Sequence, residues 1–226
     1  FEAESGQLIL VVGPSGSGKT TFLTIAGGLQ TPTNGDVKIN DSTINSLSKK
    51  QQTKLRLEKI GFVLQSYNLV PFLTVEEQFK FVDKLKKQNL TEQKLHELLS
   101  DLGLLELLKK YPNQLSGGQK QRVAIVRSLL MHPEVILFDE VTASLDPEMV
   151  REVLELINDL AQEGCTMLIV THELQFARAI ADRIIFMDKG VIAEEGTAEE
   201  FFNHPKTQRA QEFLNVFDFS QFGAYL

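Results

Sequence analysis

The sequence predicts an α/β fold with a mainly parallel sheet, and three observations support this prediction. Short apolar runs such as Leu8–Val12, Ile60–Leu64 and Val135–Phe138 are rich in Val, Ile and Leu and do not alternate with polar residues. Strands that are buried on both faces have this composition. Stretches with helical periodicity separate the runs, which is typical of a parallel sheet covered by helices. A hairpin-like pair of strands late in the chain predicts a partial antiparallel edge.

The strands and helices follow one another in a definite order. Early strands are expected at Leu8–Val12, Val37–Ile39 and Ile60–Leu64. Between Leu73 and Leu130 leucines recur at helical spacing among Lys, Gln and Glu, so we expect an α-helical subdomain, roughly residues 66–128, inserted in the α/β core. The later elements are expected at Val135–Phe138, Pro147–Gln162 (helix), Met167–Val170, Phe176–Ala181 (helix), Arg183–Met187 and Val191–Glu195, with Asp188-Lys189-Gly190 between the last two.

The tail, residues 197–226, is amphipathic. Its phenylalanines are Phe201, Phe202, Phe213, Phe217, Phe219 and Phe222. We expect this stripe to pack against the core, and a segment that binds a partner is the alternative.

Composition narrows the class of protein. The 226 residues are 42% hydrophobic and 23% charged, which suits a globular chain with a sizeable core in one or two domains. The net charge of −7, with no basic tract, gives no indication of a nucleic-acid partner. The apolar runs are far shorter than a membrane span. The single cysteine, Cys165, excludes an internal disulfide, and the four histidines lack metal-ligand spacing.

A glycine-rich loop predicts binding of a nucleoside triphosphate. The pattern G-x-x-x-x-G-K-[ST] is matched by Gly13-Pro14-Ser15-Gly16-Ser17-Gly18-Lys19-Thr20. An apolar strand leads into it and a helix-compatible stretch follows, so its backbone N–H groups and the new helix N-terminus would form a cradle for phosphates. Lys19 is expected against the β- and γ-phosphates, and the Thr20 hydroxyl on Mg²⁺.

Polar residues that end other apolar strands complete a hydrolytic site. Asp139 ends the Val135–Phe138 run and is expected to hold the metal, while the adjacent Glu140 is expected to act as general base or to orient the attacking water. His172 follows Met167–Thr171 at the same edge of the sheet and is expected to sense the γ-phosphate. Gln65 ends Ile60–Leu64, where it can contact the metal or the water and report the nucleotide state to the helical insertion.

The pentapeptide Leu115-Ser116-Gly117-Gly118-Gln119 precedes a helix, and Ser144-Leu145-Asp146 follows Glu140 by a few residues. Together with the motifs above, they resemble the nucleotide-binding subunit of ABC transporters over essentially the whole chain. The resemblance implies an ABC-type P-loop ATPase that dimerises head-to-tail, most simply as a homodimer. Each ATP would lie between Gly13–Thr21 of one chain and Ser116, Gly117, Gly118 and Gln119 of the other.

The resemblance also implies an assembly at the membrane. The chain would bind transmembrane permease subunits peripherally at the cytoplasmic face, next to Gln65, with a solute-binding protein as an indirect partner. Asp146 would cross to the partner chain, although capping of the following helix, with Pro147 at its first position, is an equal alternative. The chain begins 12 residues before Gly13, without the upstream aromatic residue that stacks on adenine in the family, so we expect an N-terminal truncation.

Two segments point to different cargo. Residues 60–71 and Ala26–Leu29 resemble ATPases for lipoprotein release, macrolide export and haem export. Residues 166–173, 186–188 and 194–205 resemble polar amino-acid importers, and we favour this second interpretation. Soluble ABC ATPases of DNA repair or translation are the remaining alternatives, but the spacing of 95 residues between Lys19 and Leu115 leaves no room for a long coiled coil, and one set of motifs is present.

Overall fold

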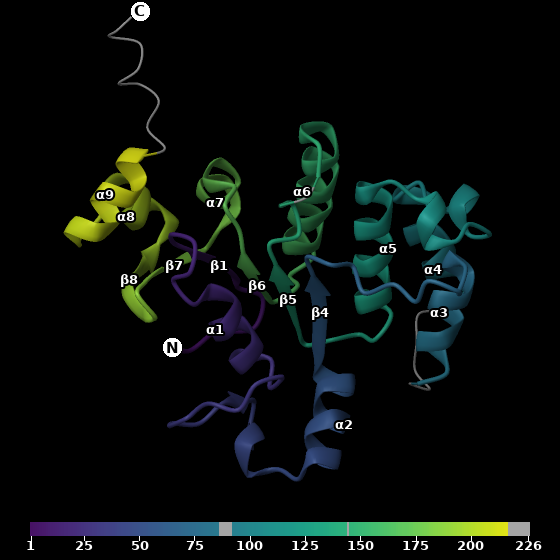
Figure 1. Ribbon diagram of the computed structural model, residues 1–226, viewed down its shortest axis with the longest axis horizontal. Coiled ribbons are helices and arrows are strands. Elements are labelled where there is room, and N and C mark those ends of the chain that lie inside the picture. Colours follow the sequence, from purple (N-terminus) through teal and green to yellow (C-terminus); the bar gives the residue numbers. More distant parts are fainter. Residues whose placement is uncertain (86–91, 144, 217–226) are drawn as a thin grey trace, which may run out of the picture.

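The computed structural model describes residues 1–85, 92–143 and 145–216 (Figure 1). A six-stranded sheet has the order β4-β5-β6-β1-β7-β8, in which β8 alone runs antiparallel to its neighbour. Its strands are β1 (Leu8–Val12), β4 (Ile60–Leu64), β5 (Val135–Asp139), β6 (Met167–Val170), β7 (Arg183–Asp188) and β8 (Val191–Thr197). A short antiparallel pair, β2 (Lys38–Ile39) and β3 (Ser42–Thr43), lies apart from this sheet. The predicted mainly parallel sheet with an antiparallel edge is confirmed.

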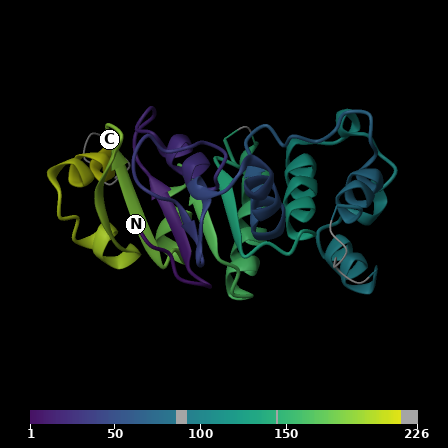
Figure 2. The same ribbon diagram turned by 90° about the horizontal axis from the view of Figure 1, so that it is seen from below.

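The helices of the described residues fall into groups around the sheet. They are α1 (Lys19–Ala26), α2 (Lys49–Lys59), α3 (Val75–Asp83), α4 (Glu92–Asp101), α5 (Gly117–Leu129), α6 (Pro147–Gln162), α7 (Leu174–Ile180), α8 (Ala198–Asn203) and α9 (Gln208–Val216), with 3-10 turns at Ile44–Ser46, Leu105–Leu107 and Pro112–Gln114. Figures 1 and 2 show α3, α4 and α5 beyond β4 at one end of the sheet, and α8 and α9 beside β8 at the other.

Alternation along β1 shows why the sheet needs cover on both faces. Leu8, Leu10 and Val12 belong to a core cluster that includes residues of α5, α6 and α7. Ile9 and Val11 point the other way, into a cluster that includes Leu23 of α1. Side chains alternate between the two faces of a strand, so both sets must be apolar when both faces are covered. The continuous apolar run seen in the sequence is the result.

Helix α5 contacts two clusters. Ala124 and Ile125 pack in the cluster of the sheet, whereas Val123 and Val126 pack with α3 and α4 in a separate helical cluster. Since α5 serves both, the boundary of the helical subdomain near residue 128 stays a prediction.

Several elements differ from the sequence expectations, and β5, β7 and β8 end at Asp139, Asp188 and Thr197, one or two residues later than expected. Helix α2, capped by Ser48 and Gln51, occupies the stretch before β4, for which no helix was predicted from the sequence. No residue of α2 is fully buried, so its sequence shows little apolar periodicity. The helix expected at Phe176–Ala181 runs from Leu174 to Ile180, and β2 starts at Lys38 rather than Val37.

The phenylalanines at the start of the tail pack on the core. Phe201 is fully buried, and its ring centroid lies 5.8 Å from that of Phe186 in β7 and 5.3 Å from that of Phe202. Phe213 lies 5.1 Å from Phe186. The remaining phenylalanines of the tail, Phe217, Phe219 and Phe222, fall outside the described residues.

Among the described residues, no helix is both long enough and apolar enough to cross a membrane.

Candidate nucleotide site

The register of the parallel strands brings the predicted site residues to one edge of the sheet. Leu64 pairs with Asp139, and Asp139 pairs with Val170. Val170 also pairs with Val11 of β1. The residues that leave these strands next, Gln65, Glu140 and the Gly13 loop, therefore start from the same edge, with His172 one residue further on. Ligands of open α/β sheets gather at this edge.

The loop before α1 is tightly packed and needs its first glycine. Gly13 has φ +149, and a Cβ there would come within 2.1 Å of the Met187 carbonyl oxygen. Lys19, only 5% exposed, donates from Nζ to the carbonyl oxygens of Gly13 at 3.0 Å and Pro14 at 3.1 Å. Burial lowers the pKa of Lys19, which the Glu140 and Asp139 charges counteract. Two carbonyl oxygens of the loop thus hold the Lys19 ammonium next to the loop backbone.

Oxygen donors suited to a hard cation lie beside this loop. The Thr20 hydroxyl donates to Asp139 Oδ1 at 3.0 Å. Burial raises the pKa of Asp139, while the hydrogen bond from Thr20 lowers it. The described residues contain no group of three or more His, Cys, Asp or Glu side chains that could enclose a metal by themselves. One hydroxyl and one carboxylate fit Mg²⁺, because that ion usually takes one or two protein oxygens together with substrate phosphates.

An unpaired hydroxyl supports the same interpretation of the loop. Ser17 Oγ is buried and has no hydrogen-bond partner in the structure. Buried polar groups are normally satisfied, so such an atom within a phosphate-binding motif fits a ligand that binds there.

Glu140 and His172 form the pair that the sequence placed at the strand ends. Glu140 Oε1 lies 2.9 Å from His172 Nε2 and 3.9 Å from Lys19 Nζ. The backbone of Glu140 has φ +47, an unusual conformation for a residue with a side chain, and its N–H donates to the Val170 carbonyl at 3.0 Å. Strained residues of this kind concentrate at functional sites. The turn aims the Glu140 side chain toward Lys19, away from the continuation of β5.

Gln65 is exposed directly after β4. The segment that follows it is held by α5, because Arg127 donates to the carbonyl oxygens of Tyr67 at 3.1 Å and Asn68 at 2.5 Å. Tyr67 and Asn68 both have positive φ. The sequence contained no signal for Arg127, since the contact joins residues about 60 positions apart.

The pentapeptide Leu115–Gln119, called the signature segment below, has its own hydrogen bonds, and these do not involve the loop before α1. Ser116 caps α5 by accepting from the Gln119 N–H at 3.2 Å, and the Gln119 side chain accepts from the Ser116 N–H at 3.0 Å. The Gly118 N–H points to Met149 Sδ at 3.3 Å. In the described part of this one chain, no hydrogen bond or ion pair joins residues 116–119 to residues 13–21. Gly117 lies in the first turn of the same helix.

Asp146 occupies the N-cap position of α6, but its side chain makes no capping hydrogen bond. The interpretation of Asp146 as a side-chain cap was therefore wrong, although Pro147 does take the first helical position. Ser144, the first residue of that loop, lies outside the described residues.

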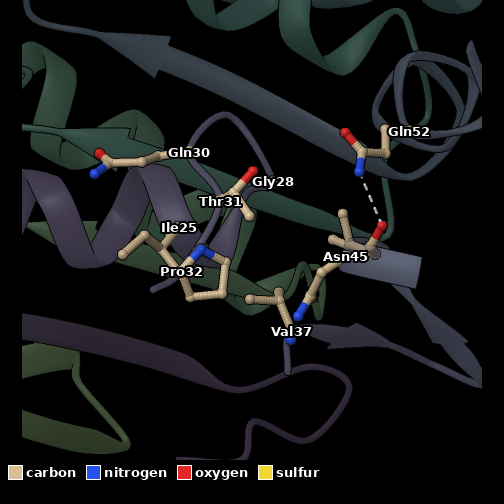
Figure 3. Close-up of a pocket in the computed structure, with 9 residues that line it drawn as sticks. Ile25, Gly28, Gln30, Thr31, Pro32, Val37, Asn45 and Gln52 are labelled. Atoms are coloured by element: carbon tan, nitrogen blue, oxygen red, sulfur yellow. Dashed lines mark hydrogen bonds between the residues drawn. The ribbon is translucent and has the colours of Figure 1, made fainter. Parts of the chain in front are cut away.

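A small cavity lies between α1 and the β2–β3 segment, and its lining includes Gly28, Gln30, Asn45 and Gln52 (Figure 3). Its volume of about 10 Å³ is roughly the space that one water molecule needs. Gln52 Nε2 donates to the Ile44 carbonyl oxygen there at 3.1 Å. This cavity is too small for a nucleotide.

Comparison with known proteins agrees with this geometry. A family model described as "ABC transporter" matches residues 1–143, and a second, described as "AAA domain, putative AbiEii toxin, Type IV TA system", matches residues 110–178. The arginine transport ATP-binding protein ArtM of Bacillus subtilis is 48% identical over 92% of this chain and 88% of the relative. The glutamate/aspartate import ATP-binding protein GltL of Escherichia coli K12 is 44% identical over 94% and 89%, respectively.

A solved structure shows the same fold. The ATP-binding cassette MJ0796, as a dimer in a post-hydrolysis state with ADP and Pi, superimposes with a TM-score of 0.78 at 36% identity, covering 88% of each chain. The match of the family model over more than half of the chain, together with these relatives, shows that the chain belongs to the ABC transporter family of ATP-binding cassettes.

Proposed function

We propose that this chain is the ATP-hydrolysing subunit of an ABC importer for polar amino acids. The observation that carries the hydrolytic part is the position of Glu140 at the sheet edge, where its Oε1 lies 3.9 Å from Lys19 Nζ and 2.9 Å from His172 Nε2. The relatives support the cargo, because those compared are named for the transport of arginine, cystine, or glutamate and aspartate.

The residues divide the work of phosphoryl transfer to water. Backbone N–H groups of residues 13–21 would bind the phosphates, with Lys19 turning from the Gly13 and Pro14 carbonyls to the β- and γ-oxygens. Thr20 and Asp139 would hold Mg²⁺, which when bound offsets negative charge on the phosphates. Glu140 would accept the proton of the attacking water or orient it, and His172 would keep Glu140 in place through their 2.9 Å contact.

The signature segment would complete the site of a second chain. Among the described residues, no hydrogen bond or ion pair joins residues 116–119 or Asp146 to residues 13–21 of the same chain, and MJ0796 is dimeric in the matching structure. In a head-to-tail homodimer, the N-terminus of α5 would offer its donors to the γ-phosphate of the partner. Binding of ATP would close this dimer, hydrolysis would open it, and permease subunits docked near Gln65 would carry the motion across the membrane. The chain would then act at the cytoplasmic face.

The test is to identify the membrane partner. We would purify the tagged Glu140→Gln chain from native membranes with ATP, and measure uptake of radiolabelled amino acids by proteoliposomes that contain the co-purified permease. A permease that imports a polar amino acid only with the parent chain and ATP would support the proposal. A permease with a large extracytoplasmic domain and no uptake would favour export, as the resemblance of residues 60–71 suggests. Recovery of no membrane protein would contradict a role in transport.

A further inference from the structure

The end of β7 and the turn that follows it, residues 187–190, lie against the loop that precedes α1. The Gly190 N–H donates to the Ser17 carbonyl oxygen at 3.1 Å. The Met187 carbonyl closely approaches Gly13, and a Cβ on Gly18 would lie 3.6 Å from Gly190 Cα. Residues 187–190 therefore touch both ends of the glycine-rich loop. A shift of this turn would move the backbone N–H groups that face the phosphates.

Asp188, the last residue of β7, is held by an arginine from the C-terminal part of the chain. Asp188 is 8% exposed, and Arg209 of α9 reaches both of its oxygens, from Nε to Oδ2 and from Nη2 to Oδ1, each at 3.2 Å. This two-point contact fixes the orientation of the carboxylate as well as its position. Arg209 also donates from Nη1 to Glu212 at 2.5 Å, on its own helix. The Arg209 guanidinium keeps the pKa of Asp188 below its usual range.

Helix α9 is itself anchored to the sheet, so Arg209 projects from a fixed base. Glu194 of β8, 8% exposed, accepts from the N–H groups of Lys206 and Thr207 and from the Thr207 hydroxyl, each at 2.8 Å. Phe213 stacks on Phe186 of β7 at 5.1 Å between ring centroids. The same strands that carry the turn therefore carry the helix that clamps it.

We propose that Arg209 is a positioning residue for the nucleotide, which acts through Asp188 and residues 187–190 to hold the glycine-rich loop in its binding conformation. Within the described part of the chain, the side-chain hydrogen bonds of Arg209 go to Asp188 and Glu212, and none goes to residues 13–21 or Glu140. We therefore expect Arg209 to affect the affinity for ATP through Asp188 and not to take part in bond breaking. The inference rests on the proposed nucleotide site. It makes the C-terminal part of the chain a support for ATP binding at a loop almost 200 residues earlier.

The test separates affinity from turnover. We would compare KM and kcat for ATP hydrolysis, and the Kd for ATP, in the parent chain, Arg209→Gln, Asp188→Asn and the double variant. We expect KM and Kd to rise about three- to tenfold in each single variant, with kcat within about twofold of the parent. The double variant should be no worse than either single one, because both break the same contact. Arg209→Lys should not restore affinity, since an ammonium cannot reproduce the two-point contact.

Glu212→Gln is the matched control. It removes the other carboxylate bound to Arg209 but leaves Asp188 in contact, so KM should stay at the parent value. Thermal unfolding without nucleotide shows how much of each variant is folded, and Kd is taken from the folded fraction. Unchanged Kd in Arg209→Gln and Asp188→Asn, with a parent chain that binds ATP, would overturn the inference alone. An apparent kcat that falls with the folded fraction while KM stays at the parent value would also overturn it. A parent chain that binds no ATP would overturn the proposed function as well.

Discussion

Replacement of Glu140 by Gln tests the assignment of the hydrolytic residues. The amide keeps the size of the side chain and an oxygen for the 2.9 Å contact with His172, but it cannot accept a proton. Lys19, Thr20 and Asp139, which we assign to phosphate and metal, are untouched. Loss of a general base typically costs about 10²- to 10⁴-fold in rate, or about 3–5 kcal/mol of transition-state stabilisation. Binding of ATP should be as tight as in the parent or tighter, because a negative charge 3.9 Å from Lys19 is removed.

The assay is single-turnover hydrolysis with protein in excess over ATP, together with equilibrium binding of ATP and size-exclusion chromatography. We expect normal binding, a rate lowered by two to four decades, and an ATP-dependent dimer that persists. Glu155→Gln is the control, since Glu155 makes an exposed pair with Arg151 on α6, and its rate should equal that of the parent. Hydrolysis by Glu140→Gln at the parent rate would show that Glu140 is neither the base nor the residue that orients the water.

Three further predictions concern other parts of the chain. Ser116→Arg should leave ATP binding by the monomer intact and abolish ATP-driven dimerisation on a sizing column. It should also cost about 1 kcal/mol of stability, because the side-chain cap of α5 is lost. Unchanged dimerisation would contradict the head-to-tail model. Burial raises the pKa of Asp139 above its ordinary 3.8, so this carboxyl favours the folded state below that value and loses its contribution as pH rises through the raised pKa. The free energy of unfolding of Asp139→Asn, measured in urea without nucleotide, should therefore increase relative to that of the parent as pH rises through this window. A difference between the two free energies that does not change with pH would contradict the burial of the Asp139 carboxyl. Gly27→Ala should destabilise the protein by about 1–3 kcal/mol, because a Cβ would come within 1.9 Å of Phe62; Phe62→Leu in the same chain should recover part of this loss, and simple additivity in urea unfolding would contradict the predicted clash.

Much of the fold could be predicted because its signals are local. Strands β1, β4 and β6 and helix α6 begin and end where the sequence placed them, since each is a continuous apolar run or a periodic stretch bounded by Gly, Pro or polar residues. Helix α2 was missed because it is exposed on most sides and its boundaries depend on the Ser48 cap. For α7, the N-terminal bound differed because no side-chain cap marks the start at Leu174.

The candidate site also has features that could be predicted from the sequence and features that could not. Lys19, Thr20, Asp139, Glu140 and His172 could be assigned from sequence because each stands at a fixed offset from a strand end, and parallel strands bring those ends to one edge. The contact of Gly118 with Met149 could not be predicted, because it depends on how closely α5 and α6 pack. The missing cap at Asp146 depends on a side-chain rotamer, which residue type does not decide.

The sequence by itself determined the α/β class, the glycine-rich loop and the residue types at the sheet edge, since these depend on short-range patterns of apolar, glycine and charged residues. Only the tertiary structure decided that Lys19 turns onto the loop carbonyls, that Glu140 adopts a left-handed backbone to meet His172, and that Arg209 clamps the turn beside the loop. These last features join segments that are distant in sequence. Whether these contacts form depends on differences of a few tenths of an ångström in how the segments pack, and a local pattern of residues does not determine such differences.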